Sequence, residues 1–270
     1  MQTFSIKNLN DAFKKMKFKK NNSYIIHSSL THLGLLKGKP IEQIPKNIFN
    51  VLIKNLGRDS TISVPTSDWN YSQKKTLFDK KSSVAHKDFG GLSQYFVKRK
   101  RSFRSNNPLF NITAIGKKAK YITGGNTNNA FGKDSAWDRL YNLNSEILLL
   151  GCDFSETNFT FTRYIEFRFG VPYLYNKLFQ QPINQNKKKI FDFSISTLRY
   201  HDLDIQYDLK NFKKILKKRK ILVENTDKKI KITRVKMKPC FDLGIECLKK
   251  DINFFLKKKP KYKNKLYPLI

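Results

Sequence analysis

The stretch that decides the fold is EILLLGCDFSETNFTFTRYIEF, residues 146–167. The aliphatic run at its start predicts a central strand over residues 146–152 that is apolar on both faces. Gly151 ends this strand, and the residues beyond it predict a helix from about Asn158 to Phe167. A strand, a glycine turn and a helix in succession are typical of α/β proteins. We therefore expect an α/β chain.

Other segments extend this pattern in both directions. We expect strands at residues 23–29, 61–64, 172–175 and 190–200, and helices at residues 8–18, 41–56, 90–97, 135–143, 209–220 and 241–256. The polar, irregular segment 67–89 is longer than an ordinary loop, and such loops tend to be functional. No internal repeat and no Gly/Ser-rich linker divides the chain. We expect one compact domain over residues 1–256, followed by a basic tail at 257–270.

The composition excludes several classes of protein. Of the 270 residues, 39% are hydrophobic and 13% are aromatic, which is enough for a packed core and excludes a disordered chain. Three cysteines without a CxxC pair exclude a disulfide framework and a zinc ribbon. The N-terminal segment has no apolar signal region, and the longest apolar run is far too short to span a bilayer. We expect a cytoplasmic protein.

The charge balance is extreme, with 54 Lys and Arg against 21 Asp and Glu, or a net charge of +33. One interpretation is a protein that binds nucleic acid or an anionic membrane surface. The other is a solvated lysine coat, because Lys, Asn, Ile and Phe are abundant together, as in chains encoded by AT-rich codons. In either case the positive field would attract an anionic ligand such as a nucleotide cofactor.

Several familiar site motifs are absent from the chain. It contains no GxxxxGK[ST], no GxGxxG and no GxSxG. The four histidines are His27, His32, His86 and His201. None has HExxH spacing and the cysteines are remote in sequence, so we expect no metal site.

Three places carry candidate chemistry. The first is HSSLT, residues 27–31, at the end of a predicted strand, where hydroxyl and backbone N–H groups suit a phosphate or carbonyl oxygen; the alternative is an ordinary turn. The second is RSFRSNNPLFN, residues 101–111, which is either an anion clamp beside a proline turn or a solvated basic loop. In the third, Thr160, Arg163 and Glu166 share roughly one helical face and form either a polar substrate site or a surface ion pair.

Seven strings containing these places follow one another along the chain. They are YIIHSSLTHLG (24–34), ISVPT (62–66), FGGLSQYF (89–96), RSNNPLFNITAIGKKA (104–119), FGKDSAWDRLYNL (131–143), ILLLGCDF (147–154) and TFTRYIEFRFGVPY (160–173). Together, in this order and spacing, they resemble the aminoglycoside 3-N-acetyltransferase family. The likeness runs from about Tyr24 to Tyr175 and continues more weakly to about Leu256.

This resemblance implies a single α/β domain with a mixed sheet flanked by helices, unlike the fold of the common small acetyltransferases. It implies transfer of an acetyl group from acetyl-CoA, or of another acyl group from its CoA thioester, to an amino group of an aminocyclitol, amino sugar or related amine. Such proteins also occur in bacterial polysaccharide loci, so an anionic or nucleotide-linked acceptor in surface polysaccharide synthesis is a further expectation. The partners would be CoA and a small-molecule amine.

The resemblance also assigns roles to individual residues. Backbone and hydroxyl groups of His27, Ser28, Ser29 and Thr31 would meet the CoA arm and its thioester, while Arg104 and Ser105 would hold an anion of CoA or of the acceptor. The catalytic residues would be Glu166, Arg163, Thr160 and His27, with Glu166 orienting or deprotonating the amine. The acceptor would contact Asp79, Asn107, Asp153, Arg163 and Glu166.

Two motifs depart from the family pattern. The first pattern is RS-x-HP with a serine four positions after the histidine, and here Asn107 and Asn111 occupy those two places. The second is T-x-x-H-x-x-E, whose histidine is the family's general base, and here Arg163 replaces it while Thr160 and Glu166 are kept. An arginine cannot accept a proton, and the loss of a positioned base typically costs about 10²–10⁴ in rate.

Three accounts of this replacement are open. Glu166, His27 or His86 could serve as the base; the amine could arrive uncharged, so that orientation and an oxyanion hole suffice; or the chain could be a non-catalytic ligand-binding protein on the same fold. Arg163 itself would suit an acidic acceptor through bidentate pairing.

We expect the N-acetyltransferase, with the non-catalytic binding protein as the alternative. A nucleic-acid binder driven by the high charge is a third hypothesis, and it lacks an arginine-rich helix. For the enzyme, His27, Arg104 and Glu166 should line one cleft at the C-terminal ends of the strands near 23–29 and 146–152.

Overall fold

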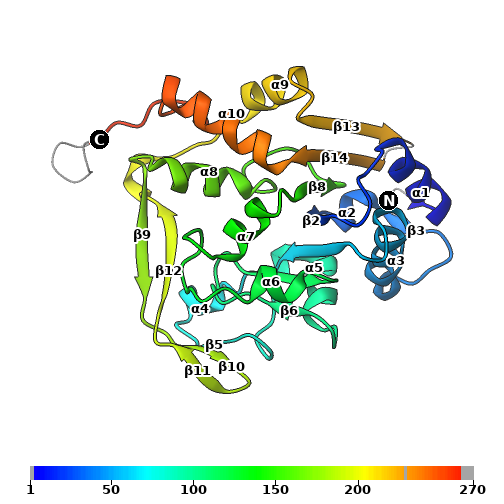
Figure 1. The fold of residues 1–270 in the computed structure, drawn as a ribbon, viewed down its shortest axis with the longest axis horizontal. Helices are drawn as coiled ribbons and strands as arrows, with labels where there is room; N and C mark the ends of the chain where they lie inside the picture. Colours follow the sequence, from blue (N-terminus) through cyan, green and yellow to red (C-terminus); the bar gives the residue numbers. More distant parts are fainter. Residues whose placement is uncertain (1–2, 228–229, 263–270) are drawn as a thin grey trace.

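A seven-stranded mixed sheet forms the centre of the computed structural model, which describes residues 3–227 and 230–262. The strand order is β13 (Leu222–Asp227), β14 (Ile230–Lys236), β8 (Glu146–Leu150), β2 (Ser23–Ser28), β4 (Thr61–Pro65), β7 (Ile112–Ile115) and β6 (Phe103–Arg104). The three middle strands β8, β2 and β4 are parallel. The outer strands on both sides run antiparallel to their inner neighbours. The C-terminal ends of β8, β2 and β4 therefore meet at one edge of the sheet (Figure 1).

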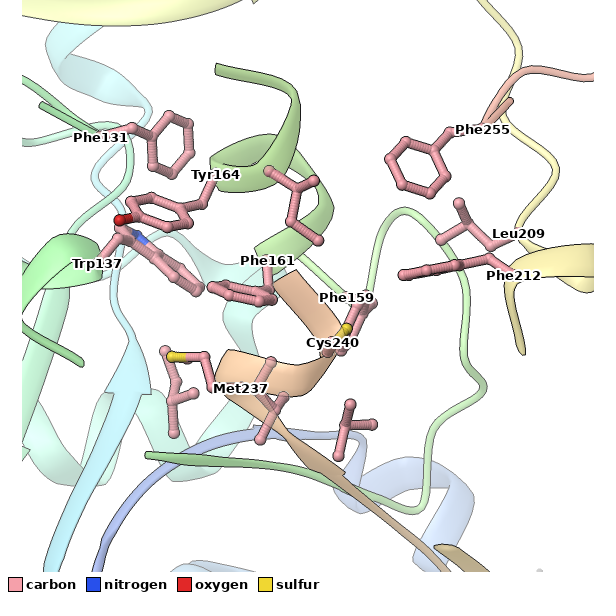
Figure 2. Close-up of a cluster of buried hydrophobic side chains, with 14 of the residues drawn as sticks. Phe131, Trp137, Phe159, Phe161, Tyr164, Leu209, Phe212, Met237, Cys240 and Phe255 are labelled. Atoms are coloured by element: carbon pink, nitrogen blue, oxygen red, sulfur yellow. The ribbon is translucent and has the colours of Figure 1, made fainter. Parts of the chain in front are cut away.

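Helices cover both faces of this sheet. Side chains at alternate positions of a strand point to opposite faces, so Leu148 and Leu150 of β8 join one buried cluster and Ile147 and Leu149 join another. The first cluster includes residues of α1 (Ile6–Lys15), α3 (Ile44–Leu56) and α5 (Gly90–Val97). The second includes residues of α7 (Ala136–Asn142), α8 (Phe161–Phe169), α9 (Lys210–Lys218) and α10 (Met237–Lys250), and Figure 2 shows its aromatic side chains packed around Met237 and Cys240.

Short elements complete the fold. The helices are α2 (Leu30–Leu33), α4 (Asn70–Gln73) and α6 (Ala119–Thr123), with single turns η1 (Ile41–Gln43), η2 (Lys87–Phe89) and η3 (His201–Leu203). Strands β9 (Leu174–Phe179) and β12 (Ser194–Arg199) form an antiparallel ribbon at one end of the molecule (Figure 1). Strands β11 (Lys188–Phe191), β10 (Ile183–Gln185) and β5 (Phe78–Asp79) form a small sheet beyond it, and β1 (Thr3–Phe4) pairs with β3 (Leu35–Leu36). In the described part of the chain, no helix combines the length and apolar character that crossing a membrane requires.

The expected α/β fold, a mixed sheet flanked by helices, is confirmed. The helix predicted over residues 90–97 is α5, and Ser135 caps α7 by accepting the backbone N–H of Asp138. In the helix at 41–56, residues 41–43 form the single turn η1, and Pro45 lies in the first turn of α3.

Other boundaries differ from the prediction. The segment 190–200 is not one strand, because a break separates β11 from β12 and places them in different sheets. The last helix starts at Met237 rather than at 241 and ends at Lys250, since Asp251 adopts an extended conformation. The predicted basic tail begins with structured residues: the N–H of Lys257 donates to Gln206 O, and Lys258 pairs with Asp204. Residues 263–270 of that tail lie outside the described residues.

Candidate active site

A cleft of about 670 Å³ opens beyond the C-terminal ends of β2 and β4. In open sheets with parallel strands, ligands bind at this edge, where the loops diverge. The volume suits a small organic ligand. The lining residues include Ile26, His27, Ser28, Pro65, Ser67, Trp69, Asp88, Phe89, Ser93, Phe110, Asn111, Trp137, Glu156, Thr160, Arg163 and Arg199. Four of the residues expected from the sequence, His27, Ser28, Thr160 and Arg163, thus share one cleft.

His27 is the second-last residue of β2, and it lines the cleft at the end of that strand. It lies on the same face of β2 as Ile25, and its ring centroid is 6.4 Å from that of Trp137 on α7. The residue is 7% exposed, and Nε2 has no hydrogen-bond partner among the described residues. Burial lowers the pKa of His27 to about 4. The ring is therefore neutral near pH 7, which makes it a poor base but leaves a buried nitrogen free to bond a ligand.

Arg163 enters the cleft from the first turn of α8 and is tied to three neighbours. Its Nη2 donates to Glu156 Oε1 at 2.6 Å, and its Nη1 donates to the Tyr207 hydroxyl at 2.6 Å. Glu166 Oε2 lies 3.9 Å from Nη1. Burial would lower the pKa of Arg163, but the neighbouring Tyr207, Glu166 and Glu156 raise it overall. Arg163 is thus a fixed cation in the place where the family pattern has a base.

Glu166 lies behind Arg163 and does not line the cleft. It is fully buried, and its two oxygens accept hydrogen bonds from the hydroxyls of Tyr173 at 2.8 Å and Tyr207 at 2.9 Å. Burial raises the pKa of Glu166 to about 7, although the nearby Arg163 opposes the rise. From within the core the carboxyl group contacts Tyr207 and Arg163, and a direct contact between Glu166 and the amine stays a prediction.

Arg104 and Ser105 also lie outside the cleft lining, and their role in holding an anion stays a prediction. The Arg104 guanidinium is 5% exposed and donates to Asn111 Oδ1 at 2.7 Å, Thr66 O at 2.7 Å and Ser83 O. The hydroxyl of Ser105 accepts the backbone N–H of Ile112 at 2.9 Å. These donors and acceptors are used within the fold, so the two residues brace the segment after β4 against the turn before β7.

Asn107, which stands at the place of a family histidine, fixes the loop that borders the cleft. Its Oδ1 accepts the backbone N–H groups of Leu109 at 3.1 Å and Phe110 at 2.9 Å. Its Nδ2 donates to Asn128 O and to Ile195 O of β12, each at 2.9 Å. The residue is 4% exposed and does not line the cleft itself. These hydrogen bonds hold the loop, and the expected contact of Asn107 with the acceptor stays a prediction.

The remaining predicted residues have other surroundings. Asp79 is buried at the small sheet, where burial would raise its pKa but backbone N–H groups of Lys187, Lys81 and Ser82 lower it overall. Asp153 is exposed and pairs with Lys231. The Ser29 hydroxyl bonds to His32 Nδ1 at 2.6 Å, and Thr31 is exposed on α2. None of these four expected ligand contacts belongs to the cleft lining.

The turn after β8 closely approaches the end of β2. Gly151 has φ +69°, and a Cβ atom there would lie only 2.8 Å from Ser29 O and 2.7 Å from Leu33. A glycine at this position therefore lets the turn after β8 approach the end of β2.

Sequence reasoning missed several cleft residues. Glu156 and Arg199 form an ion pair on the cleft wall, with Arg199 Nη1 3.4 Å from Glu156 Oε1. Trp69 stacks on His86, with ring centroids 4.5 Å apart, and also lines the cleft, as does Asp88. His86 itself, considered as a base, is absent from the lining. The acidic and aromatic residues in segment 67–89 support its expected functional importance, although no spacing rule identifies them singly.

The cleft has groups that fit an acetyl thioester. The unpartnered Nε2 of His27 suits a carbonyl oxygen, and hydroxyls of Ser28, Ser67 and Ser93 lie along the lining beside apolar Pro65 and Phe89. In the described ranges 3–227 and 230–262, no group of three or more His, Cys, Asp or Glu side chains is arranged to hold a metal ion.

Comparison with solved structures shows the same fold in several enzymes. A structure described as AAC-VIa bound to sisomicin matches with a TM-score of 0.75 at 16% identity, covering 92% of this chain and 98% of that one. Aminoglycoside acetyltransferase AAC(3)-Xa matches with a TM-score of 0.77 at 16% identity, covering 92% and 93%. AAC-IIIb in a binary complex with CoASH matches with a TM-score of 0.74 at 16% identity, covering 96% and 100%.

The sequence comparisons give a family but no near relative. No curated protein sequence matches the chain significantly. The sequence profile of one family matches residues 25–249, most of the chain, including every cleft residue described above. The expected resemblance is confirmed, and this chain belongs to the aminoglycoside 3-N-acetyltransferase family.

Proposed function

We propose that this protein transfers an acetyl group from acetyl-CoA to the amino group of an amino sugar, aminocyclitol or related amine bound in the cleft. The observation that carries the proposal is the gathering of His27, Ser28, Thr160 and Arg163 at the edge where β2, β4 and β8 end. Family membership supports the same reaction. The proposed compartment is the cytoplasm, where cells hold acetyl-CoA.

The end of β2 is the proposed place of the thioester. The neutral ring of His27, with a proton on Nε2, would donate a hydrogen bond to the thioester carbonyl oxygen. That bond would strengthen as negative charge develops on the oxygen in the tetrahedral intermediate, and the burial of Nε2 would add to its strength. The Ser28 hydroxyl, also on the lining, is in the region proposed for the pantetheine arm.

The acceptor attacks as an uncharged amine in this proposal. The nitrogen lone pair forms the new C–N bond, the C–S bond breaks, and the sulfur leaves as CoA thiolate; the proton released from nitrogen goes to solvent. Arg163 cannot take that proton, because its guanidinium group is already positively charged. Catalysis then rests on orientation of the two reactants and on stabilisation of the developing oxyanion.

Two features of the cleft suit an amino sugar. Trp69, Phe110 and Trp137 supply aromatic surface on which a sugar ring can lie. Asp88 and Glu156 supply carboxylates, and Arg163 and Arg199 supply guanidinium groups, so the lining can bind amine and acidic substituents together. An anionic or nucleotide-linked amino sugar, as in surface polysaccharide synthesis, is the finer proposal for the acceptor.

Thiol release from acetyl-CoA, measured with a panel of amino sugars and aminoglycosides, tests the proposal. We expect release only when an amine is present, with acetylation of its nitrogen shown by mass spectrometry. The matched control is Glu246→Gln, which removes an exposed Arg219–Glu246 ion pair on α10 and should leave the rate unchanged. Binding of acetyl-CoA without release for any amine would instead favour the non-catalytic binding protein.

A further inference from the structure

We propose that Arg163 and Arg199 form a binding site for a carboxylate or phosphate group of the acceptor, and that Glu156 fills this site as an internal substitute until the acceptor arrives. The inference rests on the proposed function, because it names the chemical class of that acceptor. The charged residues that surround Arg163 in the cleft are not apparent from the T-x-x-R-x-x-E motif alone.

Two guanidinium groups meet on a single carboxylate oxygen. Glu156 Oε1 lies 2.6 Å from Arg163 Nη2 and 3.4 Å from Arg199 Nη1. The two arginines come from different elements, α8 and β12, and both lie over the ring of Tyr207, with their Cζ atoms 4.7 and 5.8 Å from its centroid. Tyr207 therefore holds the pair in place even when no carboxylate lies between them.

Tyr207 is itself well anchored. Its hydroxyl accepts from Arg163 and donates to Glu166, and its backbone forms a bridge with Leu256. The hydroxyl stays protonated, because burial and the adjacent Glu166 raise its pKa well above the ordinary value. The arginine pair is thus built on a rigid base.

Glu156 is more exposed than Arg163, whose side chain is 10% exposed. It lies in the loop between β8 and α8, its side chain is 20% exposed, and it lines the cleft. Its partners in the described structure are the two guanidinium groups. Glu166, by contrast, is fully buried and has two tyrosine hydroxyl donors. Of the two carboxylates beside Arg163, Glu156 is the one that a ligand can replace.

The charges favour such a replacement. With Glu156 displaced, two fixed cations would face the cleft, and Glu166, whose burial favours its protonated form, would offset them only in part. Planar guanidinium groups bind carboxylate and phosphate oxygens through paired hydrogen bonds. An amino sugar that carries either group would satisfy both arginines and present its amine to the thioester.

Isothermal titration calorimetry without CoA tests this inference. The probes are inorganic phosphate, glucosamine 6-phosphate and glucosamine, and the proteins are the wild type, Glu156→Gln and Glu246→Gln. Glu246→Gln is the matched control, since it also frees an arginine, the exposed Arg219 at the end of α9. We expect Glu156→Gln to bind both phosphate probes at least tenfold more tightly than the wild type, with no such gain for glucosamine.

A second variant identifies the site. The double variant Glu156→Gln/Arg199→Gln should lose the gain, because one guanidinium has been removed. Equal or weaker phosphate binding by Glu156→Gln, or an equal gain in Glu246→Gln, overturns the inference. The titration uses no acetyl-CoA, so failure of the transferase proposal, seen as absent thiol release, is a separate result.

Discussion

Replacing Glu166 by Gln should stabilise the protein increasingly as the pH rises. Burial raises the pKa of this carboxyl from 4.5 to about 7. Below pH 4.5 the group is protonated in both the folded and the unfolded state. Between pH 4.5 and about 7 the unfolded chain releases the proton while the folded protein keeps it, so the free energy of unfolding falls over this range.

The size of the effect follows from the shift. Each unit of pKa corresponds to about 1.4 kcal/mol, so the buried carboxyl costs on the order of 3 kcal/mol above pH 7. Most of that loss occurs between pH 5 and pH 8.5. Gln keeps the shape and an oxygen for a tyrosine hydroxyl but cannot ionise. The free energy of unfolding of the variant minus that of the wild type should therefore increase by about 2–3 kcal/mol between pH 5 and pH 8.5.

Urea unfolding of both proteins at pH 5, 6.5 and 8.5 measures this difference, and subtraction cancels the other titrating groups. The control is Glu246→Gln, whose exposed carboxyl has a pKa lowered to about 2 by its hydrogen bonds with Arg219 and Lys250, and which should show no pH-dependent difference over this range. A constant or falling difference for Glu166→Gln would show that Arg163 keeps Glu166 ionised in the folded protein. The charge account of the arginine site would then be wrong.

Three further predictions concern single side chains. Arg163→Ala should raise the KM of an acidic amino sugar at least tenfold in a thiol-release assay, and Arg163→His should not restore activity; a gain with His and no effect of Ala would indicate a disabled enzyme instead. His27→Leu should lower kcat by about 10²-fold with little change in the KM for acetyl-CoA. His27→Gln keeps an N–H donor and should retain more activity, so an equal kcat in the two variants would exclude the oxyanion role. Arg104→Ala should lower the free energy of unfolding by on the order of 3 kcal/mol in urea titrations, because three hydrogen bonds of a buried guanidinium are lost, and an unchanged stability would contradict its bracing role.

The central α/β pattern could be predicted because its signals are local. The run 147–150 is apolar on both faces, and Gly57 and Ser135 mark the end of one helix and the start of another. Strands β13 and β14 were missed because polar and charged residues interrupt their apolar positions, as in LVENTD (222–227) and IKITRVK (230–236). In the structure, Ile230 and Ile232 of β14 face the core beside β8, while the intervening lysine points outward.

The site residues also fall into those that local sequence signals predict and those that only the fold brings together. His27, Ser28, Thr160 and Arg163 follow strand ends or a helix start, so their place in one cleft could be expected from sequence. The hydrogen-bond partners of Arg104 could not be predicted, because Thr66 and Ser83 come from segments remote in sequence. Glu156 and Arg199 could not be identified from the sequence, because their ion pair joins the loop before α8 to β12.

The central claim, that the cleft binds acetyl-CoA, is tested most directly by the change in melting temperature on adding acetyl-CoA. A ligand that binds only the folded state should stabilise it by about 2.7 kcal/mol at a concentration of 100 Kd. We predict a rise in melting temperature that saturates with acetyl-CoA, is unchanged in Glu246→Gln, and is lost in Ser28→Leu, which narrows the cleft at the end of β2. No rise with acetyl-CoA, together with tight, strongly salt-dependent binding of random DNA, would contradict the account and favour the nucleic-acid binder.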